Sequence, residues 1–191
     1  MDKAKIFTTF YEGGQREFEC RYVNDKRDGL AIEWHENGEV KSKQYFKMGV
    51  RDGICKMWYE GGQQKAISFY KDNLMEGEYI GWKLNGYKSI QCSFKSGALH
   101  GRYIAWGTYE YIVCEKNFEI GRLHGLCTYW YPNGLKESEQ HYIAGEPSSS
   151  RREWYFSGKQ KMLDDFNFGK ETCLTEDVDG IRHFVSTDYY E

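Results

Sequence analysis

The segment LAIEWHENGEVKSKQYFKMGVRDG, residues 30–53, contains the features that recur along this chain. Its Trp34 is one of six tryptophans, and consecutive tryptophans are always 24 residues apart. A second aromatic residue, Phe46, follows 12 residues after Trp34. Self-similarity at a fixed period of this length is the sequence signature of a repeat protein. The sequence therefore predicts a tandem array of 24-residue units.

Two columns of aromatic residues follow this period. The tryptophan column consists of Trp34, Trp58, Trp82, Trp106, Trp130 and Trp154. The second column consists of Tyr22, Phe46, Tyr70, Phe94, Phe118, Tyr142 and Phe166. Neighbouring rings stabilise a sheet by roughly 0.5–1.5 kcal/mol per pair beyond area burial. We interpret both columns as the structural core of the repeats.

Each unit is predicted to be a β-hairpin. Ala31–His35 is the first strand, and the Asn37-Gly38 dipeptide favours a type I′ turn. Glu39–Phe46 is the returning strand, and Lys47–Gly53 is a loop to the next hairpin. Glycines at these intervals would cost a helix roughly 1 kcal/mol each, which argues against an α-helical solenoid.

The spacing of the two columns also predicts their orientation. Trp34 and Phe46 are separated by an even number of residues, and side chains two apart share a face of a strand. We therefore expect both columns on one face. The predicted fold is all-β, an elongated twisted antiparallel sheet of about seven tandem hairpins over residues 1–170. Residues 171–191, with six acidic residues and one arginine, are expected to be an acidic C-terminal cap or tail.

Composition restricts the function. The formal net charge of −3 and the pI near 6.0 provide no basic footprint for nucleic acid. No apolar run approaches the roughly 20 residues of a membrane-spanning helix, and the start MDKAKIF contains no apolar leader. We expect a cytoplasmic protein in a reducing compartment, or one in the host cytoplasm or virion if it is viral, without a membrane partner.

No catalytic, metal or cofactor site is predicted. The sequence contains no G-x-S-x-G, H-E-x-x-H or P-loop motif, and the expectation is that it is not an enzyme. Equivalent cysteines such as Cys20 and Cys92 are three periods apart, too far for a disulfide, and are expected to be small apolar fillers. His100 and His124 precede glycines and are expected on the turn surface.

Two segments depart from the repeat. Trp106–Tyr111 lacks the turn glycine, and Gly145–Glu153 has Ser149 where other units have glycine. Such departures are consistent with drift in tolerant loops. The alternative is a partner-binding patch that includes Arg151 and Arg152.

The unit FKMGVRDGICKMWYEGG, residues 46–62, resembles the MORN repeat, in particular the longer variant of YwqK-like antitoxin or immunity proteins. Arrays similar to this one are found in large DNA viruses of amoebae. The resemblance implies a β-hairpin array without cofactor that contacts protein partners and sometimes forms homodimers. The expected function is a non-catalytic repeat scaffold for protein–protein interaction or self-association. The alternatives are a toxin-neutralising antitoxin and a phospholipid-surface adaptor.

Overall fold

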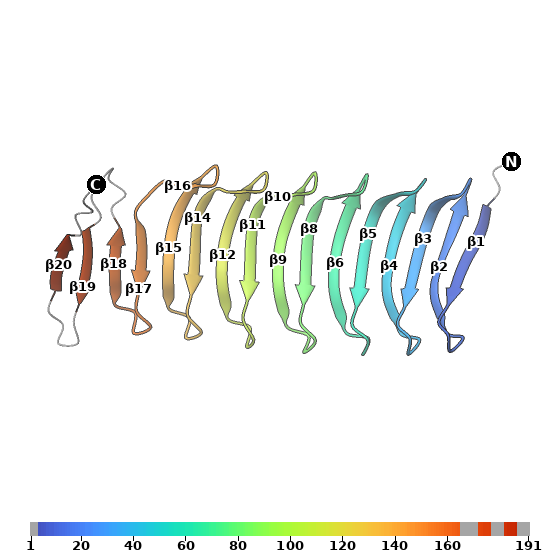
Figure 1. Cartoon of the computed structure of the whole chain (residues 1–191), viewed down its shortest axis with the longest axis horizontal. Helices are drawn as coiled ribbons and strands as arrows, with labels where there is room; N and C mark the ends of the chain where they lie inside the picture. Colours follow the sequence, from blue (N-terminus) through green and yellow to red (C-terminus); the bar gives the residue numbers. More distant parts are fainter. Residues whose placement is uncertain (1–3, 165–171, 177–181, 187–191) are drawn as a thin grey trace. The chain divides into compact units, whose positions relative to one another are not determined.

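A computed structural model describes residues 4–164, 172–176 and 182–186 (Figure 1). The chain divides into two units, Met1–Leu99 and His100–Glu191, and the boundary falls within the repeat array. All regular structure in the described residues is β-strand, and paired strands are antiparallel within each unit. The predicted all-β fold of tandem hairpins is therefore confirmed.

Strands follow one another closely in both units. The first unit contains β1 (Ala4–Phe10), β2 (Arg16–Val23), β3 (Lys26–Trp34), β4 (Val40–Lys47), β5 (Val50–Trp58), β6 (Gln64–Lys71), β7 (Leu74–Met75), β8 (Gly77–Trp82), β9 (Lys88–Lys95) and β10 (Ala98–Leu99). The second unit contains β11 (Gly101–Trp106), β12 (Ile112–Glu119), β13 (Arg122–Leu123), β14 (Gly125–Trp130), β15 (Lys136–Ile143), β16 (Glu146–Pro147), β17 (Arg151–Trp154), β18 (Gln160–Asp164), β19 (Thr172–Glu176) and β20 (Arg182–Ser186).

The turn at Asn37-Gly38 differs from the predicted type I′. The amide of Gly38 donates to the carbonyl of His35 at 2.9 Å, and the amide of His35 donates to the carbonyl of Glu39 at 2.8 Å. Gly38 has a φ of 88°, whereas Asn37 is not among the residues with positive φ. This is a type I turn followed by a left-handed residue, which is accompanied by a β-bulge. The register shift at Glu33/Trp34 is consistent with that bulge.

The prediction of a loop at Lys47–Gly53 was wrong. Strand β4 continues to Lys47 and β5 starts at Val50, so only Met48 and Gly49 connect them. Their φ values are 49° and 92°, and a two-residue connection with both φ positive is a type I′ turn. The tight turn therefore joins successive hairpins instead of closing each one. Equivalent pairs with positive φ are Asn24-Asp25, Asp72-Asn73, Ser96-Gly97, Ile120-Gly121 and Ala144-Gly145.

The prediction that both aromatic columns share a face was also wrong. Phe46 lies opposite Gly29, and Gly29 is five residues from Trp34 on the same strand. Because side chains alternate along a strand, the register places Trp34 and Phe46 on opposite faces. The even spacing misled because the hairpin pairs residues whose numbers add to an odd total, as in Glu33 with Ser42.

We call the face that carries Phe46 and its equivalents the ring face, and the other the tryptophan face. Rings of both columns are half-buried wherever the structure describes their side chains, and Phe166 of the second column lies outside the described residues. Small residues on the ring face are fully buried, namely Cys20, Ala31, Cys55, Ala66, Ser68, Cys92, Cys114, Cys127 and Ser138. The core of each unit is thus a stripe of small side chains along its sheet.

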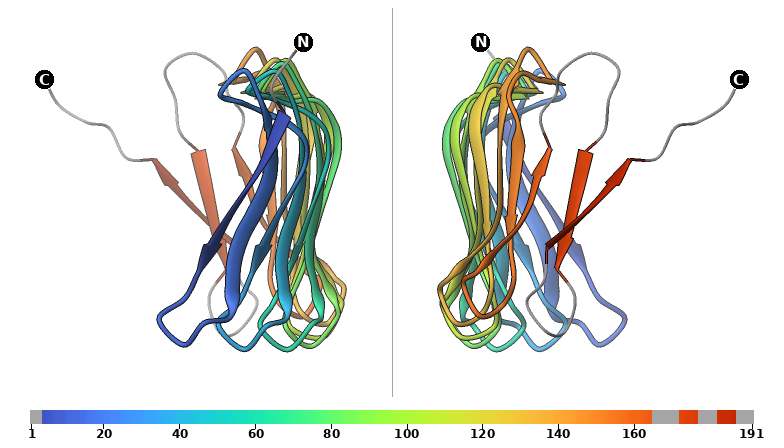
Figure 2. Two further views of the ribbon diagram at one scale, coloured as in Figure 1. Left: turned by 90° about the vertical axis from the view of Figure 1, so that its right-hand side faces the viewer. Right: turned by 90° about the vertical axis from the view of Figure 1, so that its left-hand side faces the viewer.

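Within each unit the strands are bent along their length, and successive strands of the first unit are rotated relative to one another (Figure 2). This is the twist expected of an open β-sheet. At the C-terminal end, β19 pairs with β20 in a separate two-stranded sheet. Most of the predicted cap, including residues 177–181 and 187–191, lies outside the described residues, and its capping role stays a prediction.

Candidate interaction site

Side chains at the hairpin tips link each repeat to the next. The residue that follows the large aromatic residue directs its side chain to the backbone carbonyl of the tryptophan 23 residues later. These contacts are Tyr11 Oη to Trp34 O (2.7 Å), His35 Nε2 to Trp58 O (3.1 Å), Tyr59 Oη to Trp82 O (2.8 Å) and Tyr131 Oη to Trp154 O (2.8 Å). The repeated tip residues are therefore occupied in holding the fold together.

The opposite ends of the hairpins are linked through the backbone. The second residue of each type I′ turn donates its amide to a carbonyl 22 residues earlier. These bonds are Gly49 N to Arg27 O (2.7 Å), Asn73 N to Arg51 O (2.9 Å), Gly97 N to Met75 O (2.8 Å) and Gly145 N to Leu123 O (2.8 Å). Since repeated positions serve the fold at both ends, recognition of a partner is left to positions that differ between repeats.

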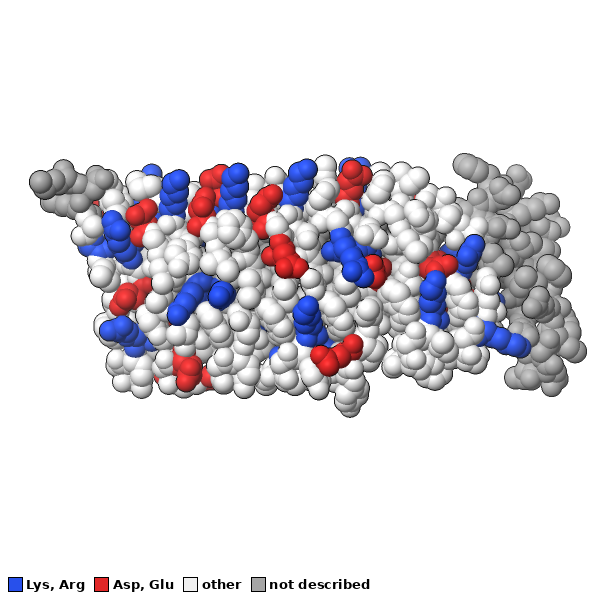
Figure 3. Space-filling view, turned by 180° about the vertical axis from the view of Figure 1, so that it is seen from behind, with Lys and Arg blue, Asp and Glu red and all other residues white. Residues whose placement is uncertain are grey.

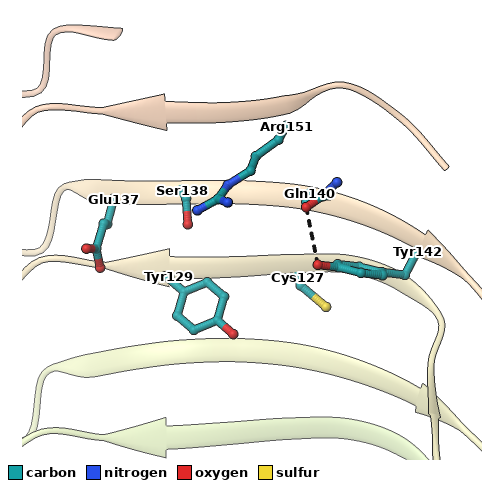
Figure 4. A pocket seen from close by; sticks show the side chains of 7 residues that line it. All are labelled: Cys127, Tyr129, Glu137, Ser138, Gln140, Tyr142 and Arg151. Carbon is teal, nitrogen blue, oxygen red and sulfur yellow. Dashed lines mark hydrogen bonds between the residues drawn. The ribbon is translucent and has the colours of Figure 1, made fainter. Parts of the chain in front are cut away.

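A hollow of about 340 Å³ lies on the ring face of the second unit (Figure 4). Its floor contains Cys127 and Ser138, which are 3 % and 9 % exposed. Burial raises the pKa of the Cys127 thiol, which keeps the floor uncharged at neutral pH. The remaining lining comes from β14, β15, β17 and the start of β15, with Tyr129, Glu137, Gln140, Tyr142 and Arg151.

Polar groups in this hollow are arranged around the ring of Tyr142. The Tyr142 hydroxyl donates to Gln140 Oε1 at 3.2 Å. In Figure 4 the Arg151 side chain extends from β17 towards Ser138. Its guanidinium forms an ion pair with Glu153 at 2.5 Å, so its charge is partly balanced. The sequence marked Arg151 as a candidate but gave no reason to group it with Cys127 and Tyr142.

The structure separates the two arginines of the candidate partner patch. Glu153 lies opposite Ser138 and Arg152 lies opposite Glu139. Arg151 therefore shares the ring face with Ser138, whereas Arg152 is on the tryptophan face, 3.5 Å from Glu139 Oε1. The two side chains do not belong to one surface.

The irregular hairpin tip at Trp106–Tyr111 keeps its turn without the glycine. Glu110 occupies the glycine position with a φ of 60°, which is a strained region for a residue with a Cβ. At Gly107 a Cβ would lie 2.1 Å from the Tyr111 ring, so the ring fills the space of the tip side chain found in other repeats. Tyr109 at this tip is 84 % exposed.

Further large apolar side chains are exposed at the turns of the second unit. Ile120, Ile143 and Phe156 are each more than half exposed. Phe156 contacts Tyr131 edge-on, with ring centroids 5.4 Å apart, and Asn133 Nδ2 donates to the Phe156 carbonyl at 2.9 Å. These contacts hold the Phe156 ring in place although it faces solvent.

The cysteines whose side chains are described are free and buried, namely Cys20, Cys55, Cys92, Cys114 and Cys127. His124 Nδ1 lies 3.4 Å from Glu119 Oε2, and His100 is half-buried with its Nδ1 unpaired. Within the described parts of the chain, no three His, Cys, Asp or Glu side chains come together as metal ligands. These residues therefore suggest no metal centre there.

Basic and acidic side chains are interspersed on the face shown in Figure 3. Many form pairs, such as Arg102 with Glu115 at 2.6 Å and Lys136 with Glu139 at 2.6 Å. No broad region of one sign is visible on that face, which gives no favourable field for a highly charged partner. In the described residues there is no helix of the length and hydropathy needed to cross a membrane.

Comparison with known proteins identifies the repeats. Residues 27–48 and 51–72 match the family model of the MORN repeat variant, and residues 117–136 match that of the MORN repeat. The first two matches cover strands of the first unit, and the third lies in the second unit. No curated protein matches the chain.

Proposed function

Because this chain is a MORN-repeat protein, we propose that it is a non-catalytic scaffold that binds protein partners through side chains that vary between its repeats. MORN repeats are interaction modules without enzymatic chemistry of their own. The repeated residues supply the hydrogen bonds that connect the hairpins. The variable residues are consequently the ones available for contact with a partner.

The observation that carries this proposal is the exposure of large apolar side chains at the turns. Tyr109 at 84 % and Phe156 at 58 % exposure extend from hairpin tips of the second unit. The position equivalent to Phe156 in earlier repeats is Glu, as at Glu36 and Glu60. Exposed apolar clusters with a polar surround are typical of protein-binding sites. Aromatic residues are also enriched among those that contribute most to binding.

The test compares proteins retained by immobilised full-length chain from extracts of the native host. The Tyr109→Ser/Phe156→Ser variant removes the exposed rings, and Glu60→Ser is the control at an equivalent tip. We expect specific partners to be retained by the wild type and by Glu60→Ser, and lost from the double variant. Thermal unfolding of all three should be similar, since these side chains are exposed. Identical sets of retained proteins on all three would contradict the proposal.

Self-association is one form of the same function. Light scattering on the purified chain distinguishes a homodimer from a monomer, and loss of a dimer in Tyr109→Ser/Phe156→Ser would place the contact at these tips. A toxin-neutralising antitoxin is the second candidate, supported by the variant type of the repeats at residues 27–48 and 51–72. A single toxic enzyme as the retained partner would favour it. A phospholipid-surface adaptor would instead sediment with anionic vesicles.

A further inference from the structure

The rings of the second column are covered by other side chains on the ring face. In the early repeats the cover is a guanidinium. Arg27 lies 5.0 Å from the ring centroid of Phe18 and 5.2 Å from that of Phe46, and Arg51 lies 4.4 Å from that of Tyr70. These are cation–π distances.

Later repeats use a ring as the cover. The Tyr79 and Phe94 centroids are 6.4 Å apart at an interplanar angle of 78°, and the Tyr103 and Phe118 centroids are 5.9 Å apart at 61°. Both are edge-to-face contacts of the favourable kind. The tyrosine occupies the position that holds a small residue in the early repeats, such as Cys55.

The two covers replace one another. Position A is held by Arg27 and Arg51, and position B, four residues later, by Ala31 and Cys55. In the next two repeats position A is apolar and position B is tyrosine, as with Met75 and Tyr79 or Leu99 and Tyr103. Each of these four repeats thus supplies one cover.

Tyr142 lacks both covers. In its repeat, position A is Leu123 and position B is Cys127. No aromatic ring or cationic group lies over the Tyr142 ring in the part of the chain that the structure describes. The hollow beside Cys127 and Tyr142 occupies the space that a position-B tyrosine fills elsewhere (Figure 4).

We propose that this hollow receives an aromatic side chain, tyrosine or phenylalanine, from a protein partner. The chain itself indicates the occupant, because the same position is filled by Tyr79 and Tyr103 in other repeats. At about 340 Å³ the hollow is at the lower end of the roughly 300–1,000 Å³ range of ligand pockets. That size suits a single side chain better than a large cofactor.

The surroundings of the hollow provide further contacts for such a ring. Tyr129 and Tyr142 offer ring surfaces, the floor is uncharged, and the Arg151 guanidinium and Ser138 hydroxyl supply polar groups at the side. An aromatic anchor in a pocket with a polar rim is the usual form of an energetically dominant contact in protein interfaces. The inference rests on the proposed scaffold function, since it names one contact that a partner uses.

The test uses N-acetyl-tyrosinamide as a probe, with N-acetyl-leucinamide as the aliphatic control. Side-chain NMR signals of Tyr129, Tyr142 and Arg151 are followed during titration into the full-length chain. We expect saturable shifts with the aromatic probe and at least about tenfold weaker binding of the aliphatic one. Non-saturating shifts, or equal affinity for the two probes, would overturn the proposal.

Two variants supply the missing cover by different routes. Cys127→Tyr places in position B the residue found in other repeats, and Leu123→Arg places a guanidinium in position A. Either should weaken binding of N-acetyl-tyrosinamide at least about tenfold. Met75→Arg makes the same position-A change where Tyr79 already covers Phe94, and should leave the affinity unchanged.

Circular dichroism establishes that each variant is folded before titration. If one blocking variant fails to fold, the other decides. Undiminished binding in a folded Cys127→Tyr or Leu123→Arg variant would overturn the proposal. That result would leave the scaffold function itself intact, because the Tyr109→Ser/Phe156→Ser comparison tests it separately.

Discussion

Replacing Tyr59 by Phe removes one hydroxyl and leaves the ring in place. The lost hydrogen bond is the 2.8 Å contact with the Trp82 carbonyl, which joins two successive repeats. The ring contact with Lys65, whose Nζ lies 5.4 Å from the ring centroid, does not depend on the hydroxyl. The substitution therefore isolates the connection between repeats from the packing of the aromatic side chain.

The expected cost follows from the position of this bond. A typical intramolecular hydrogen bond contributes about 0.5–1.5 kcal/mol to stability. The contact is only partly buried, so water can replace some of the lost interaction, and we expect about 1 kcal/mol. If the first unit, Met1–Leu99, unfolds cooperatively, its midpoint should fall by about 4–8 °C.

Thermal and urea unfolding, followed by tryptophan fluorescence, measure this change. The chain provides its own control in His35, whose ring nitrogen lies 3.1 Å from the Trp58 carbonyl at the equivalent tip. Tyr59→His should accordingly retain more stability than Tyr59→Phe. Tyr11→Phe should cost a similar amount and add to Tyr59→Phe, since the two bonds share no partner. Unchanged stability in both Phe variants would refute the stabilising role of these contacts.

Three further predictions concern strain and ionisation. Glu110→Gly should stabilise the second unit by about 1 kcal/mol in urea unfolding, because Glu110 has a φ of 60° and glycine adopts such angles without strain. Burial raises the pKa of the Cys92 thiol from 9.0 to about 11, so stability should be highest below pH 9 and fall as the pH rises towards 11; Cys92→Ala should reduce this dependence. The Arg102 guanidinium lowers the pKa of the Glu115 carboxyl below 4.5, so the pair should lose its contribution, about 0.2–1 kcal/mol at neutral pH, as the pH falls below that value; a double-mutant cycle at pH 7 and pH 3 measures it.

The sequence predicted the repeated hairpins because the aromatic and glycine columns keep one period. It did not predict which turn joins which strands, since Asn37-Gly38 suits a type I′ turn and also a type I turn with a bulge. The bulge near Trp34 changes the pairing by one residue, which reverses the face assigned to Phe46. Counting residues along the chain carries no information about such insertions.

The hollow was missed for a related reason. Position A and position B are not neighbours in the sequence, and their joint role becomes visible only when the register places Arg51 over Tyr70. The signal was present as an alternation between repeats, with arginine before a small residue and an apolar residue before tyrosine. Leu123 and Cys127 are the combination that follows neither pattern.

The bonds between successive tips also give the fold a direction during synthesis. The Tyr11 hydroxyl can find its carbonyl only after Trp34 has left the ribosome, and Tyr59 must similarly wait for Trp82. At about 5–20 residues per second, a 24-residue unit takes roughly one to five seconds to appear, whereas a hairpin forms in about 1–10 μs. Each hairpin therefore has ample time to dock on the preceding one before the next emerges, and the growing end of the nascent array presents one incomplete tip at a time.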